Sequence, residues 1–174
     1  MTCLGQGSGM SPEANASLSL PSGRAAVVGA PGYDRVVQQA TPMLSYEDVA
    51  AAIDWLTEAF GFQESGERYT DSDGRVGHAE LDLGGATVMV GWPGPDYQSP
   101  AHHASECEHA RRWLATPWVI DGVHVTVDDV DEHYQRARAA GATILREPED
   151  LPFGRLYSAA DVEGHRWMFM SPAP

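Results

Sequence analysis

The order of hydrophobic and polar positions predicts the same structural unit twice along the chain. In the first stretch, a short alternating run over residues 41–46 precedes an amphipathic helix. Its apolar positions follow the three- and four-residue steps of one helix face, at Val49, Ile53, Leu56 and Phe60. Asp48 is typical of a helix N-cap, and Gly61 of a helix stop. Strand patterns follow at residues 63–69, 76–83 and 86–91.

The second stretch repeats this order. Residues 119–127 alternate with valine on one face and predict a strand. A helix follows with Asp128 as its expected cap and Gly141 as its stop, and its apolar stripe consists of Val130, Tyr134 and Ala137. Strands are expected at about residues 143–147, 155–159 and 165–170, with turns over residues 148–154 and 163–164.

The two stretches predict one domain of two βαβββ units. Residues 46–49 (Tyr-Glu-Asp-Val) correspond to residues 127–130 (Val-Asp-Asp-Val), 81 positions later. Each unit is too small to bury its own sheet, so we expect the two to pair. The units span about residues 39–91 and 119–172, with a connector over residues 92–118. Residues 1–38 are rich in Gly, Ser, Ala and Pro, which predicts a flexible N-terminal extension.

The duplicated unit resembles the vicinal oxygen chelate superfamily, which includes glyoxalase I, extradiol dioxygenases, fosfomycin resistance enzymes and bleomycin-binding proteins. The second unit is the more similar, at residues 125–131 (VTVDDVD), 139–142 (AAGA) and 161–165 (DVEGH), with Val162 where proline is usual. The resemblance covers about residues 39–172 and is strongest to the bacterial PhnB-like group. It implies an α+β fold in which paired βαβββ units form a curved, incomplete-barrel sheet with helices on the outer face. It also implies a homodimer.

The same resemblance argues against the superfamily's usual metal site. Its metal-dependent members take four ligands (His or Gln, Glu, His, Glu) from the first and fourth strands of each unit. Those positions correspond here to Thr41, Val90, Gly122 and Met168. Only the threonine carries an oxygen donor, and it is a weak one. We therefore expect no metal and no cofactor.

The inner face of the predicted sheet forms the candidate ligand site. Because residues two apart on a strand share a face, the implied positions extend to a ligand-binding set of Thr41, Met43, His78, Glu80, Val88, Val90, Gly122, His124, Arg166 and Met168. This set describes a largely apolar cavity with a few polar anchors. Glu80 and His78 are the candidate catalytic groups if the chain is an enzyme. An ordinary structural role remains open for each of the polar residues.

The connector carries a donor-rich segment over residues 102–109 (HHASECEH). If it is helical, His103 and Cys107 share a face, as do Glu106 and His109. Three interpretations stay open: an exposed polar link, a metal clip, and the mouth of the ligand pocket. Trp92, Trp113 and Trp118 flank the segment and fit either a cavity rim or the joint between units.

Composition and charge narrow the partners. All eleven basic residues are arginine, which excludes a Schiff-base or phosphate-loop lysine. The net charge of −14 disfavours nucleic acid and anionic membranes, and it favours neutral or cationic ligands. No run approaches the roughly 20 apolar residues of a membrane span. The two isolated cysteines and the lack of a secretory signal pattern predict a cytoplasmic protein.

These features favour a metal-independent protein that binds a partly apolar small molecule, in a sequestration or pathway accessory role. The alternative is a lyase, isomerase or dioxygenase of the same superfamily. It would use shifted metal ligands, such as His78, Glu80 and His124, or a carboxylate or histidine general base. We favour the hypothesis of a small-molecule-binding protein over that of an enzyme.

Overall fold

The computed structural model describes residues 40–115 and 122–173. The predicted extension over residues 1–38 and the start of the predicted strand at Val119 lie outside the described residues. The described residues belong to the compact unit that begins at Gln38.

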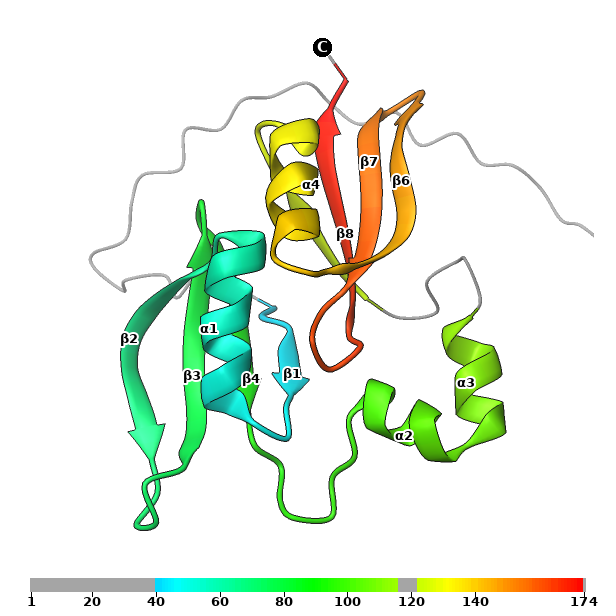
Figure 1. Ribbon diagram of the computed structural model, residues 1–174. Coiled ribbons are helices and arrows are strands. Elements are labelled where there is room, and N and C mark those ends of the chain that lie inside the picture. The colour runs from blue at the N-terminus through cyan, green and yellow to red at the C-terminus, as the bar shows by residue number, and fades with distance from the viewer. Residues whose placement is uncertain (1–39, 116–121, 174) are drawn as a thin grey trace, which may run out of the picture. The chain divides into compact units, whose positions relative to one another are not determined.

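The first βαβββ module consists of β1 (Met43–Ser45), α1 (Val49–Phe60), β2 (Gln63–Thr70), β3 (Val76–Leu83) and β4 (Ala86–Gly91). Its strands form one sheet in the order β1-β4-β3-β2. The crossover through α1 makes β1 parallel to β4, whereas the neighbours joined by turns are antiparallel. Helix α1 covers one face of this sheet (Figure 1).

The second module has the same architecture. It consists of β5 (Val123–Thr126), α4 (Val130–Ala139), β6 (Thr143–Leu151), β7 (Gly154–Ala160) and β8 (Arg166–Pro172). The sheet order is β5-β8-β7-β6, with β5 parallel to β8. The predicted α+β fold of two βαβββ modules is confirmed.

Local capping chemistry sets the helix ends. Asp48 caps α1 by accepting a hydrogen bond from the Ala51 amide at 3.0 Å, and Gly61 ends the helix with a left-handed φ of 80°. Both predictions are confirmed. In α4 the cap is Asp129, one residue later than expected, because its carboxylate reaches two free amides of the first turn, those of Asp131 and Glu132.

The predicted turn between β6 and β7 is too long. Strand β6 continues to Leu151, so only Pro152 and Phe153 separate it from Gly154 at the start of β7. Pro148 therefore lies within a strand. A sheet edge tolerates this, because an edge strand has one row of backbone groups without a ladder partner, and β6 is the last strand of its sheet.

The core lies on the helix side of both sheets and joins the modules. Helices α1 and α4 contact each other. Phe60, at the end of α1, packs its ring against Trp167 and Phe169 of β8, with centroid distances of 5.4 and 4.8 Å. Trp167 and Phe169 are both fully buried and belong to the core. One continuous hydrophobic cluster thus holds the two modules together.

The described part of the connector, residues 92–115, contains two short helices, α2 (Pro100–Glu106) and α3 (Glu108–Leu114). Neither helix has a buried residue. Among the described residues, no helix is both long enough and apolar enough to cross a membrane.

Candidate functional site

Each sheet has one face covered by its helix and an opposite face, here called the open face. In β3, Ala79 and Leu81 are buried against the core, whereas His78 and Glu80 lie on the open face and are half-buried. Glu80 is opposite Met89 in the register between β3 and β4. The open face of the first sheet therefore carries an imidazole, a carboxylate and a thioether side by side.

The predicted orientation of Val88 and Val90 is wrong. Val88 is opposite Leu81 and Val90 is opposite Ala79, and both valines are buried in the core behind α1. A shift of one residue along a strand moves every side chain to the other face. Met89, between the two valines, is the residue that β4 presents on the open face.

The second sheet presents the predicted residues on its open face. His124 is opposite Met168 in the register between β5 and β8, and Thr126 is opposite Met170. His124 is exposed and both methionines are half-buried. Methionine is flexible and polarizable, so it adapts to ligands of different shapes.

A cavity of about 520 Å³ lies between the first strand of module one and the strands β5 and β8 of module two. We call it the β1–β8 cavity. Its lining comprises Pro42, Met43, Leu44, Ser45, Tyr97, Pro100, Leu114, Gly122, Val123, Gly164, His165 and Arg166. It brings together Met43, Gly122 and Arg166 of the predicted set. Thr41, His78, Glu80, His124 and Met168 do not line it.

Arg166 acts as a support for the cavity wall. Its Nη2 donates to the carbonyl oxygens of Leu114 at 2.6 Å and Trp113 at 3.3 Å, at the end of α3. A cation at a helix C-terminus is favoured by the helix dipole and by the free carbonyls. Although Arg166 lies on the open face, its guanidinium is committed to α3 and not only to the cavity.

Two ring donors meet at one carbonyl in the cavity wall. Tyr97 donates its hydroxyl to the Ser45 oxygen at 2.7 Å, and the Nε2 of His165 donates to the same oxygen at 2.8 Å. Partial burial, together with the nearby Glu163 and Glu47 carboxylates, raises the pKa of Tyr97 to about 12. The tyrosine is therefore a neutral hydrogen-bond donor at any physiological pH.

The turn between β7 and β8 fastens module two to module one. The buried Asp161 accepts from the Tyr46 hydroxyl at 2.6 Å and from the Trp167 indole at 3.0 Å. Its other oxygen accepts from the amides of Glu163 and His165 within its own turn. Burial, and then the charge of Asp161, hold the pKa of Tyr46 well above its usual range. One carboxylate thus accepts from four donors, of which the Tyr46 hydroxyl belongs to module one.

Two glutamates extend this fastening to the connector. The Glu163 carboxylate accepts from the amides of Glu47 and Asp48 ahead of α1, at 2.8–3.1 Å. Glu47 in turn accepts from the Ser99 amide at 2.6 Å and contacts the His102 ring at 2.9 Å. The hydrogen bond from Ser99 is the main cause of a lowered pKa at Glu47. Gly164, with φ of 90°, lets the turn approach the Ala101 amide, which donates to the Glu163 carbonyl.

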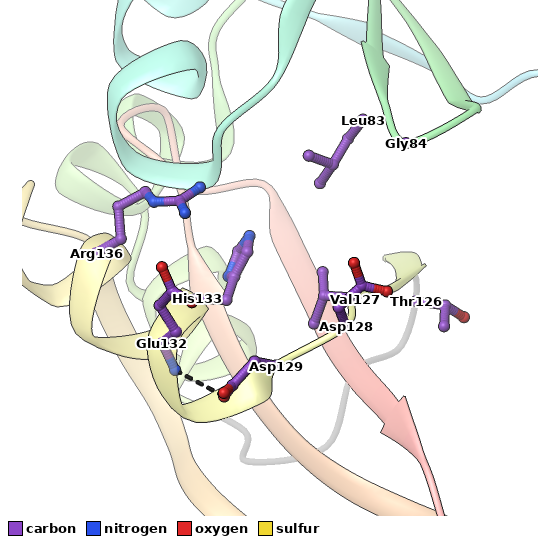
Figure 2. Close-up of a pocket in the computed structure, with 9 residues that line it drawn as sticks. All are labelled: Leu83, Gly84, Thr126, Val127, Asp128, Asp129, Glu132, His133 and Arg136. Carbon is purple, nitrogen blue, oxygen red and sulfur yellow. Dashed lines mark hydrogen bonds between the residues drawn. The ribbon is translucent and has the colours of Figure 1, made fainter.

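A second cavity, of about 310 Å³, lies between the β3–β4 turn and the start of α4 (Figure 2). One of its charged side chains, Asp129, has a structural role as the N-cap of α4. His133 is buried, donates from Nε2 to the Phe60 carbonyl at 2.9 Å, and accepts at Nδ1 from the Tyr157 hydroxyl at 2.6 Å. Burial lowers the pKa of His133 to about 4. This cavity is part of the joint between modules.

The superfamily's metal positions do not fit a metal here. Thr41 precedes β1, Val90 is buried in the core, Gly122 has no side chain, and Met168 offers only a thioether. Imidazole and carboxylate donors, which zinc and iron require, are missing from the set. Within residues 40–115 and 122–173, no three His, Cys, Asp or Glu side chains gather as a metal site. The shifted set His78, Glu80 and His124 and the connector clip are therefore not assembled.

Sequence comparison agrees with the duplicated architecture. Residues 37–169 match the family described as the Glyoxalase/Bleomycin resistance protein/Dioxygenase superfamily. The chain belongs to this superfamily. The Mycobacterium tuberculosis protein Rv0887c is 36% identical over 133 residues, covering 76% of this chain and 73% of its own.

Two solved structures share the fold. TioX from Micromonospora sp. ML1 is 37% identical, covers 79% of this chain and 98% of its own, and has a TM-score of 0.57. TnmS3, an antibiotic binding protein from Streptomyces sp. CB03234, is 19% identical, covers 78% of this chain and 98% of its own, and has a TM-score of 0.53. The likeness to TnmS3 shows the fold alone.

Sequence reasoning missed most of the cavity wall that the connector supplies. Tyr97, Pro100 and Leu114 line the β1–β8 cavity beside the three predicted residues. The aromatic residues that flank the connector were the available signal, and Trp113 is indeed next to this wall.

Proposed function

We propose that this member of the superfamily binds small, partly apolar organic molecules without a metal ion, and that it sequesters them or carries them for another protein. The observation that supports the proposal best is the β1–β8 cavity, whose lining is mixed and whose volume of about 520 Å³ is that of a drug-sized site. The description of the structurally similar TnmS3 as an antibiotic binding protein points in the same direction.

The ligand class follows from charge. The chain carries −14, which attracts cations and repels anions over the whole surface. Glu80 and Asp82 both lie on the open face of the first sheet, opposite Met89 and Thr87. These two carboxylates lie outside the β1–β8 cavity, so it is the field of the whole chain that favours neutral or cationic compounds over anionic ones.

We also propose that two copies assemble. Within one chain, the modules pack through α1 and α4, and the strand order keeps the two sheets separate among the described residues. Met43, at the edge of the first open face, remains 64% exposed. A second copy would cover this face. Light scattering should give twice the chain mass of 18.8 kDa, and the mass of a single chain at micromolar concentration would contradict the assembly.

The direct test is a thermal-shift screen with neutral, cationic and anionic compounds of similar size. A compound at 100 times its dissociation constant stabilises the folded state by about 2.7 kcal/mol. We expect neutral and cationic hits in the native protein and in Ser72→Phe, an exposed turn variant that serves as the control. Gly122→Phe, which fills the cavity, should lose them with an unchanged circular dichroism spectrum. A screen without hits would contradict the proposal.

One observation favours the enzyme alternative. His78 and Glu80 are two apart on one strand and half-buried, and no side-chain hydrogen bond or ion pair joins either of them to another described residue. Such a pair can act as a general base for a substrate bound on the open face of the first sheet, outside the β1–β8 cavity. If a screened compound is turned over, Glu80→Gln should abolish turnover and leave the binding affinity unchanged. Assignment to the PhnB-like group stays a prediction.

A further inference from the structure

The connector forms a third hollow, in the angle between α2 and α3, with a volume of about 560 Å³. We call it the α2–α3 hollow. Its lining is Tyr97, Gln98, Pro100, His103, Cys107, His109, Ala110, Trp113 and Leu114. His103 and Cys107, predicted to share a face if helical, are both part of this lining.

Hydrogen bonds at the two ends, rather than a core, hold the hollow open. At the start of α2, Glu47 accepts from the Ser99 amide and contacts His102. At the end of α3, Arg166 donates to the carbonyls of Trp113 and Leu114. Because neither helix buries a side chain of its own, no packing between them closes the space. The hollow is therefore preformed, as small-molecule sites usually are.

The hollow exposes apolar surface that a compact fold would normally cover. Trp113 is 62% exposed, although an indole gains free energy from burial. The polar groups of the lining are few, chiefly two imidazoles, one amide and one thiol. Large apolar walls with a small number of polar groups are typical of sites for drug-sized ligands.

The α2–α3 hollow and the β1–β8 cavity are adjacent to each other. Tyr97, Pro100 and Leu114 belong to the lining of both. Leu114 also holds one of the Arg166 contacts, so the same support shapes both spaces. A ligand long enough to reach past these three residues would contact the lining of both.

We propose that the α2–α3 hollow is a second chamber of the ligand site and receives a flat aromatic group, neutral or cationic, that stacks on Trp113. His103 and His109 supply hydrogen bonds at the edge of that group. The Glu106 carboxylate, which accepts a hydrogen bond from Gln98 of the lining at 3.1 Å, disfavours an anion. This inference rests on the proposed function, since it extends the same site toward elongated aromatic compounds.

The test uses Nile red, a neutral planar dye whose fluorescence rises in apolar surroundings. We expect saturable binding to the full chain. Ala110→Phe, which places a ring inside the hollow, should weaken the affinity at least tenfold. Ala115→Phe, an exposed change at the α3 C-cap outside the hollow, should change it less than twofold.

The stacking role of Trp113 has its own pair of variants. Trp113→Ala should weaken Nile red binding about tenfold, whereas Trp113→Phe, which keeps an aromatic face, should retain most of the affinity. Equal losses in both variants would contradict stacking and indicate a specific need for the indole N–H.

Cys107 provides a readout independent of dye fluorescence. In a Cys3→Ser background it is the one thiol of the chain. Saturating Nile red should slow its alkylation by monobromobimane at least fivefold. If the dye binds while the alkylation rate and the affinity of Ala110→Phe remain native, the second chamber is wrong and the proposed function stands.

Two other outcomes overturn the inference in distinguishable ways. If Cys107 protection rises with protein concentration and does not respond to dye, the hollow is an interface between copies. If neither Nile red nor any compound of the thermal-shift screen binds, both the chamber and the proposed function are wrong.

Discussion

The two faces of β8 differ in burial and in the kind of side chain that they carry. Trp167 and Phe169 point to the helix side and are fully buried against Phe60 of the other module. Met168 and Met170, on the opposite face, are half-buried. The helix side is mainly apolar, with the neutral His133 ring as its buried polar group, whereas the open faces mix thioethers, imidazoles and carboxylates. The open face combines adaptable apolar groups with a few polar ones, which is the composition that the proposed ligand binding requires.

Truncating neighbouring residues on β8 should give the largest difference between the faces. Phe169→Ala should lower the free energy of unfolding by about 3–5 kcal/mol, since it opens a cavity in the joint. Met168→Ala should cost less than about 1.5 kcal/mol, because its side chain already meets solvent. Urea unfolding at neutral pH measures both. Equal losses would contradict the assignment of the two faces.

The carboxylate that joins the modules should rank next. Asp161→Ala leaves the Tyr46 hydroxyl, the Trp167 indole and two amides without their acceptor, at a cost of about 3 kcal/mol. Asp150, which is exposed and pairs with Arg155 on the surface, is the matched control. Asp150→Ala should cost less than about 0.5 kcal/mol. A small effect at Asp161 would show that the turn does not hold the modules.

The joint should also be sensitive to acid through His133. Its folded pKa of about 4 is below the ordinary histidine value of about 6.5, so the unfolded chain binds the proton more tightly. The stability from the neutral ring is complete above about pH 6.5 and is lost as the pH falls toward 4.

Between pH 7.5 and pH 5.0 this linkage amounts to about 2 kcal/mol. His133→Gln should lose that much less over the same interval than the native protein. His103→Gln, at an exposed connector histidine, should follow the native pH profile. Parallel profiles for the native protein and His133→Gln would contradict a neutral, buried His133.

Substitutions confined to the open face should move stability least. In the single chain, at protein concentrations too low for two copies to assemble, Met43→Ser should change the free energy of unfolding by less than about 0.5 kcal/mol, because this side chain is 64% exposed. In the proposed site it should nevertheless weaken ligand binding several-fold. A stability loss above 1 kcal/mol would mean that Met43 already packs in the core of the single chain.

Much of the fold could be predicted because its signals are local. The stripe of α1, its cap at Asp48 and its stop at Gly61 all lie within one short segment, and the structure has them as expected. The register of β4 could not be derived from its own residues. Its run Ala-Thr-Val-Met-Val-Gly offers no polar alternation, and only pairing with β3 places Met89 outward. That is why the sequence pattern predicts the wrong face of the sheet for Val88 and Val90.

The connector half of the site was hidden for a different reason. Helices α2 and α3 are short and bury nothing, so they leave no apolar stripe in the sequence. Their positions depend on Glu47, Glu163 and Arg166, which are about fifty to sixty residues away along the chain. Contacts of that separation cannot be read from a local pattern. They nonetheless decide where Tyr97, Trp113 and Leu114 lie.

The most direct measurement is calorimetric titration of chelator-treated protein with the tightest compound from the thermal-shift screen. A metal-independent site predicts binding to the native chain in the absence of any added metal, with the affinity unchanged when zinc, nickel or manganese is supplied. It predicts no measurable binding to Gly122→Phe and native affinity for Ser72→Phe. Binding that requires an added metal ion, or that survives in Gly122→Phe, would contradict a metal-independent ligand site in the β1–β8 cavity.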